Sequence, residues 1–356
     1  MVVPTYKEAQ NLPVLYGRLR QALDAAGRPF ELLVVDDDSP DGTAEVVAAL
    51  GADARCIVRK GERGLATAVV RGIASAAHPI VVVMDADLSH PPEIVPALVD
   101  RLEGGERFAI GSRYVEGGRT QDWSFLRALN SWGATVLARP LTRVRDPMSG
   151  FFAVRQADVP IDALNPIGYK IALEILVKAG IRDPAEVPIV FTDRLHGESK
   201  MGFGEQARYL RHLHRLYGYR YPTLTQFLTF AFVGSTGFVV DLSVNLLAIE
   251  VFGIPFALAR LLGIAVAMTT NFVLNDRVTF HPGEEYERPW PARYLAFVGT
   301  CSVPAVVNYV VSVGLKATVP LFAQFYPLAV VAGSLAGLVF NFVGAKWFVF
   351  KRAEGG

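Results

Sequence analysis

The chain contains little charge and almost no cysteine. Only 19% of its 356 residues are Asp, Glu, Lys or Arg, the net charge at pH 7 is +1, and the two cysteines, Cys56 and Cys301, lie in different halves. A net charge this small argues against nucleic acid as a partner. Two isolated thiols match neither a disulfide framework nor a metal-binding pattern.

Several common motifs are also missing. The sequence has no G-x-G-x-x-G and no P-loop, so any nucleotide phosphates must be met by a metal ion and basic side chains. It has no Q-x-x-R-W, which argues against a processive polysaccharide synthase. The N-terminus enters a strand pattern at once, without the basic and apolar regions of a signal peptide, so we expect the first half to be cytosolic.

The charges that are present divide the chain in two. Residues 1–226 are mixed and charged, whereas between 227 and 350 the only charges outside 276–294 are Asp241, Glu250, Arg260, Lys316 and Lys346. Four apolar stretches, at about 227–249, 256–275, 295–315 and 325–349, are each long enough to cross a hydrocarbon core of about 30 Å. We therefore expect a catalytic domain at 1–205, a linker at 206–226 and an all-α membrane domain of four transmembrane helices at 227–352.

The first half alternates strand and helix patterns. Apolar runs at 30–35 and 80–84 predict buried strands, and apolar positions at helical spacing in 9–26 predict a helix. This alternation predicts an α/β, Rossmann-like domain with a mostly parallel sheet. Two of its strands run into acidic residues, at 36–38 and at 85–87, on the edge of the sheet where ligands bind.

Asp85 and Asp87 form the pattern around which the soluble half is organised. Asp-x-Asp offers two hard oxygen donors, and Mg²⁺ or Mn²⁺ accepts such ligands while keeping waters and substrate phosphates in its shell. A strand that simply ends in solvated acids has the same pattern. The metal interpretation therefore depends on the other motifs.

This pattern is one of six segments that occur in a characteristic order. They are Pro4-Thr5-Tyr6-x-Glu8, the run 36–43, the run 85–93, Gly111-Ser112-Arg113-Tyr114, the run 146–152 and Gly197-Glu198-Ser199-Lys200. Together they resemble the family 2 glycosyltransferases of GT-A fold, and among these the dolichyl (polyprenyl) phosphate mannose synthases. The resemblance covers about residues 1–215.

The resemblance implies a set of site residues. The guanosine of GDP-mannose would contact Pro4, Tyr6, Glu8, Val35 and Asp37, and the diphosphate and metal would be held by Asp85, Ala86 and Asp87. Arg113, Arg194 and Lys200 match positions near the phosphates, and Arg127 and Ser131 match the site of the lipid phosphate. Ser89 stands where some relatives carry a glutamine that adds a metal ligand, and serine is shorter. Asp85, Asp87 and Arg113 are the expected catalytic residues.

The implied reaction is an inverting transfer of mannose from GDP-mannose to a polyprenyl (dolichyl) phosphate, giving a β-linked product. A phosphate monoester is mostly dianionic at neutral pH, so no catalytic base is assigned, and we expect a structural role for His90. One alternative keeps the fold and uses UDP-glucose. An alternative of another class is a transporter that flips the lipid-linked sugar.

Residues 208–221 are basic, aromatic and leucine-spaced, which predicts an amphipathic helix at the cytoplasmic membrane surface. A helix that docks on the soluble domain is the alternative. In the membrane half, the segments 230–234 and 271–273 recur at 295–299 and 341–343, and the arrangement resembles the GtrA-type four-helix domain.

Basic residues predict the orientation of the membrane half. Arg277, Arg288 and Arg293 lie in the middle loop and Lys351-Arg352 near the C-terminus, which places both termini and the catalytic domain in the cytoplasm. The polar residues Asp241, Asn245, Asn271, Asn308 and Asn341 either pack helices together or mark a polar path. A homo-oligomer is left open.

Overall fold

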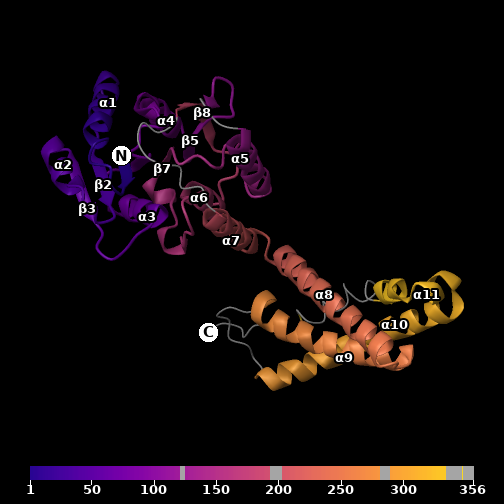
Figure 1. Ribbon diagram of the computed structural model, residues 1–356. Coiled ribbons are helices and arrows are strands. Elements are labelled where there is room, and N and C mark those ends of the chain that lie inside the picture. The colour runs from indigo at the N-terminus through magenta and orange to yellow at the C-terminus, as the bar shows by residue number, and fades with distance from the viewer. Residues whose placement is uncertain (121–124, 193–202, 281–288, 334–346, 348–356) are drawn as a thin grey trace. The chain divides into compact units, whose positions relative to one another are not determined.

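The computed structural model describes residues 1–120, 125–192, 203–280, 289–333 and 347 (Figure 1). The chain divides into two compact units, Met1–Arg220 and Tyr221–Gly356. Each unit has its own packing, and they are described in turn.

The first unit is an α/β domain built on a mixed seven-stranded sheet. Its strands, in the order β3-β2-β1-β4-β7-β5-β8 across the sheet, are β3 (Ala54–Val58), β2 (Leu32–Asp36), β1 (Val2–Thr5), β4 (Ile80–Val83), β7 (Phe152–Arg155), β5 (Phe108–Ser112) and β8 (Ala185–Pro188). Strand β7 is antiparallel to both of its neighbours, and the other six strands run in one direction. Strands β6 (Arg119–Thr120) and β9 (Val190–Phe191) form a small second sheet.

Helices cover both faces of this sheet. The helices described in this unit are α1 (Leu12–Ala25), α2 (Thr43–Leu50), α3 (Leu65–Ser75), α4 (Val95–Glu103), α5 (Phe125–Ala138), α6 (Ile171–Lys178) and α7 (Phe203–Arg220), with short 3₁₀ turns at Pro92–Ile94, Gln156–Asp158 and Ile161–Ala163. Neighbouring residues of one strand enter different cores: Val3 packs with α1 and α4, whereas Val2 packs with α3 and α6. Burial on both faces explains why the strands are apolar throughout instead of alternating.

Helix α7 docks on the first unit. The Tyr209 hydroxyl donates a hydrogen bond to the Ala134 carbonyl of α5 at 2.7 Å, and the Tyr217 hydroxyl donates to the Leu137 carbonyl at 2.7 Å. These are the contacts of a docking helix. The location of its exposed face at a membrane surface stays a prediction.

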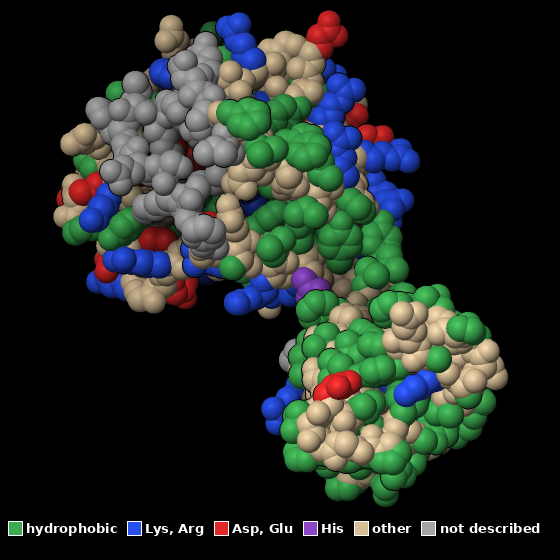
Figure 2. All heavy atoms as spheres, turned by 45° about the vertical axis from the view of Figure 1, so that its right-hand side comes forward, with side chains coloured by type: hydrophobic (Ala, Val, Ile, Leu, Met, Phe, Trp, Pro, Cys, Tyr) green, Lys and Arg blue, Asp and Glu red, His purple; other side chains and the backbone are tan. Residues whose placement is uncertain are grey.

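The second unit is helical. Helix α8 (Pro222–Leu246) continues into a π-helical turn (Leu247–Val251), α9 (Phe256–Leu274) continues into another (Asn275–Thr279), and α10 (Trp290–Thr318) and α11 (Pro320–Gln324) follow. Three of these segments are long and apolar enough to cross a membrane: Pro222–Val251, Phe256–Thr279 and Trp290–Thr318. The fourth predicted stretch, 325–349, lies mostly outside the described residues, so the count of four stays a prediction. Hydrophobic side chains cover much of this unit's visible surface (Figure 2).

An ion pair buried in this unit connects three helices. The fully buried Arg260 of α9 donates from Nη1 to both carboxylate oxygens of Asp241 on α8, each at 2.8 Å, and from Nη2 to Oδ1 of Asn308 on α10 at 2.9 Å. Gly263 makes room for this contact, because a Cβ there would lie 2.3 Å from Oδ1 of Asp241. Small residues and interhelical polar bonds of this kind pack transmembrane helices together.

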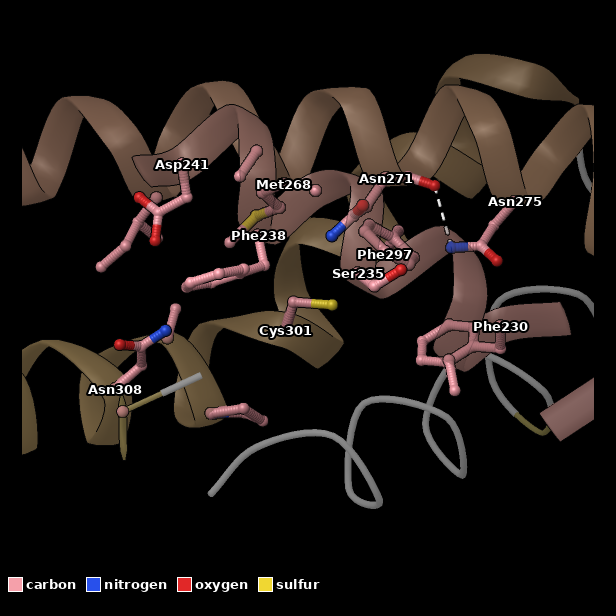
Figure 3. A pocket seen from close by; sticks show the side chains of 18 of the residues that line it. Phe230, Ser235, Phe238, Asp241, Met268, Asn271, Asn275, Phe297, Cys301 and Asn308 are labelled. Atoms are coloured by element: carbon pink, nitrogen blue, oxygen red, sulfur yellow. Dashed lines mark hydrogen bonds between the residues drawn. The ribbon is translucent and has the colours of Figure 1, made fainter. Parts of the chain in front are cut away.

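A cavity of about 300 Å³ lies beside this ion pair (Figure 3). Asn271, Ser235, Phe238 and Cys301 are among the residues around it, and Nδ2 of Asn275 donates to the Asn271 carbonyl at 2.9 Å. Asn271 also packs over a glycine of α8, where a Cβ would come within 2.0 Å of its Oδ1. Asp241 and Asn308 therefore join helices, as the packing interpretation of the sequence expected, whereas Asn271 also lines the cavity and Asn341 lies outside the described residues.

Candidate active site

Three strained loops mark one edge of the main sheet. Within the described part of the chain, the non-glycine residues with positive φ are Lys7 (65°), Asp38 (55°) and Leu88 (61°). They follow β1, β2 and β4, which are adjacent and parallel. Positive φ is costly for a bulky residue such as leucine, and such strain gathers at functional sites. The sequence-predicted acidic residues at 36–38 and 85–87 lie in the same loops.

The loop after β4 presents the Asp-x-Asp pattern. Asp87 is 7% exposed and accepts a hydrogen bond from the backbone N–H of Ser89 at 3.0 Å. The Ser89 side chain is buried, and its Oγ has no hydrogen-bond partner among the residues that the structure describes. Gly150 approaches Asp85, since a Cβ on this glycine would lie 3.6 Å from the Asp85 carboxylate.

These residues fit a divalent cation. In the part of the chain that the structure describes, no group of three or more His, Cys, Asp or Glu side chains is placed to hold a metal. Two carboxylates from one loop, with a buried unsatisfied hydroxyl beside them, suit an ion that takes its remaining ligands from water and phosphate. Asp85 and Asp87, with Ser89 adjacent, are the residues that would hold it.

His90 is held between aromatic rings. It is 2% exposed, stacks on Phe151 at 5.3 Å between ring centroids, and meets the edge of Phe191 at 5.4 Å. Its Nδ1 lies 3.9 Å from a carboxylate oxygen of Asp85. Burial lowers the pKa of His90, which favours the neutral ring. The contacts agree with the structural role expected from the sequence.

Arg113 is held by a buried carboxylate. Asp146 is fully buried and accepts hydrogen bonds from Nε and Nη2 of Arg113, each at 2.7 Å, and from its backbone N–H at 3.0 Å. The planar fork of the guanidinium matches such a bidentate contact. Asp146 therefore sets where the guanidinium points, which the sequence reasoning missed although it quoted the segment 146–152.

The loop after β3 contacts the loops after β1 and β2. Asp37 accepts a hydrogen bond from Nε of Arg59 at 2.8 Å and from the backbone N–H of Gly64 at 2.8 Å. The Tyr6 ring lies under the Arg63 guanidinium, 4.5 Å from its centroid. Arg59 and Arg63 were missed from the sequence, where arginines in and beside a glycine-containing loop carry no signal.

The remaining donor-site candidates are distributed as follows. Pro4 and Val35 face each other across β1 and β2 and are buried, and Glu8 accepts a hydrogen bond from Asn11 at 2.7 Å. Ala86 is buried in the core beneath the Asp-x-Asp loop. The predictions for Arg194 and Lys200 lie outside the described residues.

The acceptor candidates lie on α5. Ser131 is 9% exposed, and its Oγ is 2.9 Å from the hydroxyl of Tyr114. The Tyr114 ring in turn lies 5.4 Å from the Arg113 guanidinium, so α5 is connected to the Arg113–Asp146 pair. Arg127 is on the same helix, and its side chain lies outside what the structure describes.

Comparison with known proteins agrees with this arrangement. Residues 1–159 match the family Glycosyl transferase family 2, and residues 229–350 match the GtrA/DPMS transmembrane domain. The chain is 39% identical over 320 residues to a dolichol-phosphate mannosyltransferase of Pyrococcus furiosus, covering 87% of this chain and 88% of that one. It is 42% identical over 246 residues to a dolichol-phosphate mannosyltransferase of Saccharomyces cerevisiae, covering 65% and 91%.

Part of the chain is also similar to a solved glucosyl-3-phosphoglycerate synthase from Mycobacterium tuberculosis in complex with Mn²⁺ and uridine diphosphate. The TM-score is 0.46 at 22% identity, covering 62% of this chain and 78% of that one.

The sheet, its site edge and the two matched domains define a membrane-bound family 2 glycosyltransferase. More particularly, the chain belongs to the family of dolichol-phosphate mannosyltransferases.

Proposed function

We propose that this protein transfers mannose from GDP-mannose to a polyprenyl phosphate, with inversion, at the cytoplasmic face of a membrane. The observation that carries the proposal is the similarity to a dolichol-phosphate mannosyltransferase over 88% of that relative's length. The Asp-x-Asp loop and the buried Arg113–Asp146 pair support it, because the site unites acidic and basic groups suited to a nucleoside diphosphate sugar.

The chain's own residues have separate tasks in this reaction. The loops after β1 and β2, which carry Tyr6 and Asp37, hold the nucleoside. Arg113, kept in position by Asp146, offsets the negative charge of the phosphates. The acceptor phosphate is itself the nucleophile and attacks the anomeric carbon in line, so the GDP–sugar bond breaks as the new bond forms on the opposite face.

A divalent cation, Mg²⁺ or Mn²⁺, would be held by Asp85 and Asp87. When bound, it supplies Lewis-acid stabilisation of the departing diphosphate. The neutral, buried His90 packs behind this loop and keeps its shape. No residue is assigned to remove a proton, because the phosphate needs none removed.

The membrane unit anchors the catalytic unit where its lipid acceptor lies. The positions of the basic residues favour cytoplasmic termini and a cytoplasmic middle loop, with Arg277 and Arg293 in or next to that loop. Transfer from UDP-glucose and flipping of a lipid-linked sugar are the competing functions, and both are outcomes of the test below.

The test is sugar transfer by the full chain in detergent or lipid nanodiscs. Radiolabelled GDP-mannose and UDP-glucose are offered in parallel with a polyprenyl phosphate, with and without EDTA, and EDTA-treated enzyme is then resupplied with Mg²⁺ or Mn²⁺. We expect metal-dependent mannolipid from the wild type. Asp87→Ala should lose at least about 100-fold in rate, as expected when transition-state charge loses a stabilising group.

Asp183→Ala is the matched control, because Asp183 is an exposed acid in the same unit. It should transfer mannose at the wild-type rate. If the product is glucolipid instead of mannolipid, the proposed mechanism stands and the sugar donor is UDP-glucose. If folded, metal-supplied wild type forms no lipid product from either donor, the proposed function is wrong and transport becomes the leading alternative.

A further inference from the structure

A second cavity, of about 480 Å³, lies in the first unit between α5 and α7. Its walls include Leu129 and Trp132 of α5 and Leu210 of α7, all of which are at least 49% exposed. Lys170, immediately before α6, also lines it. The cavity thus combines apolar walls with one lysine ammonium.

The Lys170 ammonium uses only part of its hydrogen-bonding capacity within the described residues. Its Nζ donates one hydrogen bond, to the Met148 carbonyl at 2.7 Å, and lies 4.3 Å from the centroid of the Tyr169 ring. Across the ranges that the structure describes, no carboxylate comes within ion-pair distance of it. Glu205, the acidic residue of the cavity wall, is paired with Arg208. Two of the three N–H groups of the ammonium are therefore available to a ligand.

The Lys170 ammonium, which has no counter-ion among the described residues, favours an anionic ligand. Burying an ammonium without a counter-ion is unfavourable, and burial together with the charge of Arg113 lowers the pKa of Lys170 to about 8. Asp146, Asp85 and Glu205 also interact electrostatically with it, so Lys170 is close enough to the donor site to interact with its charges. A ligand anionic at one end and apolar beyond it would satisfy both the ammonium and the walls.

We propose that Lys170 binds the phosphate of the polyprenyl phosphate acceptor, and that the polyprenyl chain lies along the apolar walls between α5 and α7. This inference rests on the proposed function, which supplies an acceptor of that chemistry. From this position the ammonium also offsets the repulsion between the acceptor phosphate and the donor diphosphate. It is a binding residue on the acceptor side, distinct from Arg113, which faces Asp146.

The experiment compares initial rates of Lys170→Met, Lys170→Arg and wild type while each substrate is varied. Loss of a charge-assisted hydrogen bond to phosphate raises KM for the acceptor about 10- to 100-fold in Lys170→Met. The KM for the sugar donor should change by less than about threefold. Lys170→Arg keeps the charge and should recover most of the acceptor affinity.

Lys178→Met is the matched control. Lys178 is on the adjoining helix, carries the same charge and is paired with Glu174 outside the cavity, so its loss should leave the acceptor KM unchanged. Competition with a short-chain polyprenyl phosphate, the same polyprenol without phosphate, and inorganic phosphate separates the two parts of the site. Only the first should compete strongly, and Lys170→Met should remove its advantage over the polyprenol.

The proposal is overturned if Lys170→Met keeps the wild-type acceptor KM while the wild type forms mannolipid. It is also overturned if KM for both substrates rises equally and arginine does not restore it, since that pattern means that Lys170 only supports the 146–150 loop. Failure of the proposed function is a separate result, because then the wild type itself forms no mannolipid.

Discussion

Asp146 offers the sharpest test of how the site is built. Its fully buried carboxylate accepts three hydrogen bonds from Arg113, whose side chain is 8% exposed. Asp146→Asn keeps the shape of the side chain and removes its charge. The Arg113 guanidinium then loses the negative charge of Asp146, and the bidentate contact that orients it is weakened.

The expected effect is large in both stability and rate. Removing one partner of a buried ion pair costs about 3–5 kcal/mol. In a unit of about this size, each kcal/mol lowers Tm by about 2–4 °C, so the first unit should unfold about 6–20 °C lower. Misplacing a charged group by about 1 Å lowers a transfer rate by about 100-fold, and we expect a loss of that order.

The assay is thermal unfolding of the full chain together with mannolipid formation below the transition. Asp183→Asn is the control, because Asp183 pairs with Arg143 at 3.8 Å with both side chains about three-quarters exposed. An exposed pair contributes at most about 1 kcal/mol. The Asp183→Asn control should unfold within about 2 °C of wild type and transfer mannose at the wild-type rate. The reasoning is refuted if Asp146→Asn does the same.

Three further predictions concern packing and pH. Burial raises the pKa of Glu174, but the hydrogen bonds that it accepts outweigh burial and lower the pKa from 4.5 to about 2. Its contribution to stability is therefore present above pH 4.5 and is lost as the pH falls toward 2. The Tm of Glu174→Gln should accordingly depend less on pH in this range than the Tm of the wild type. Gly263→Ala should lower the Tm of the membrane unit and Gly314→Ala should not, because a Cβ meets Asp241 at the first position and nothing within 4 Å at the second. Arg260→Leu should destabilise that unit by about 3–5 kcal/mol in nanodiscs, because it leaves the Asp241 carboxylate buried without its arginine. Adding Asp241→Leu should restore more than half of the lost stability. Equal stability of the single and the double variant would contradict this prediction.

The elements with local sequence signals were predicted correctly. The apolar runs that became β2 and β4 lie buried on both faces, and the acids at their ends share one sheet edge, as expected for adjacent parallel strands. Three of the four predicted spanning stretches lie in helices that are long and apolar enough to cross a membrane, because a run of about 20 apolar residues needs no tertiary contact to be recognised.

The direction of β7 had no such signal. Its residues 152–154 form an apolar run like those of its neighbours, but the strand enters antiparallel between β4 and β5. Strand direction depends on how the chain returns to the sheet, and here α5 and a long loop precede it. The strain at Leu88 was equally invisible, since positive φ at leucine is imposed by the surrounding fold.

The class of protein, the two-part organisation and the Asp85–Asp87 pattern could be predicted from the sequence alone, because composition, periodicity and motif order can be recognised without tertiary contacts. Three features required the tertiary structure. Asp146 orients Arg113 although the two residues are 33 positions apart, Arg260 joins three helices, and Lys170 lines a cavity between α5 and α7. Each of these features combines residues from separate elements, and only the packing of those elements brings charges within hydrogen-bond distance or leaves an ammonium without a counter-ion among the described residues.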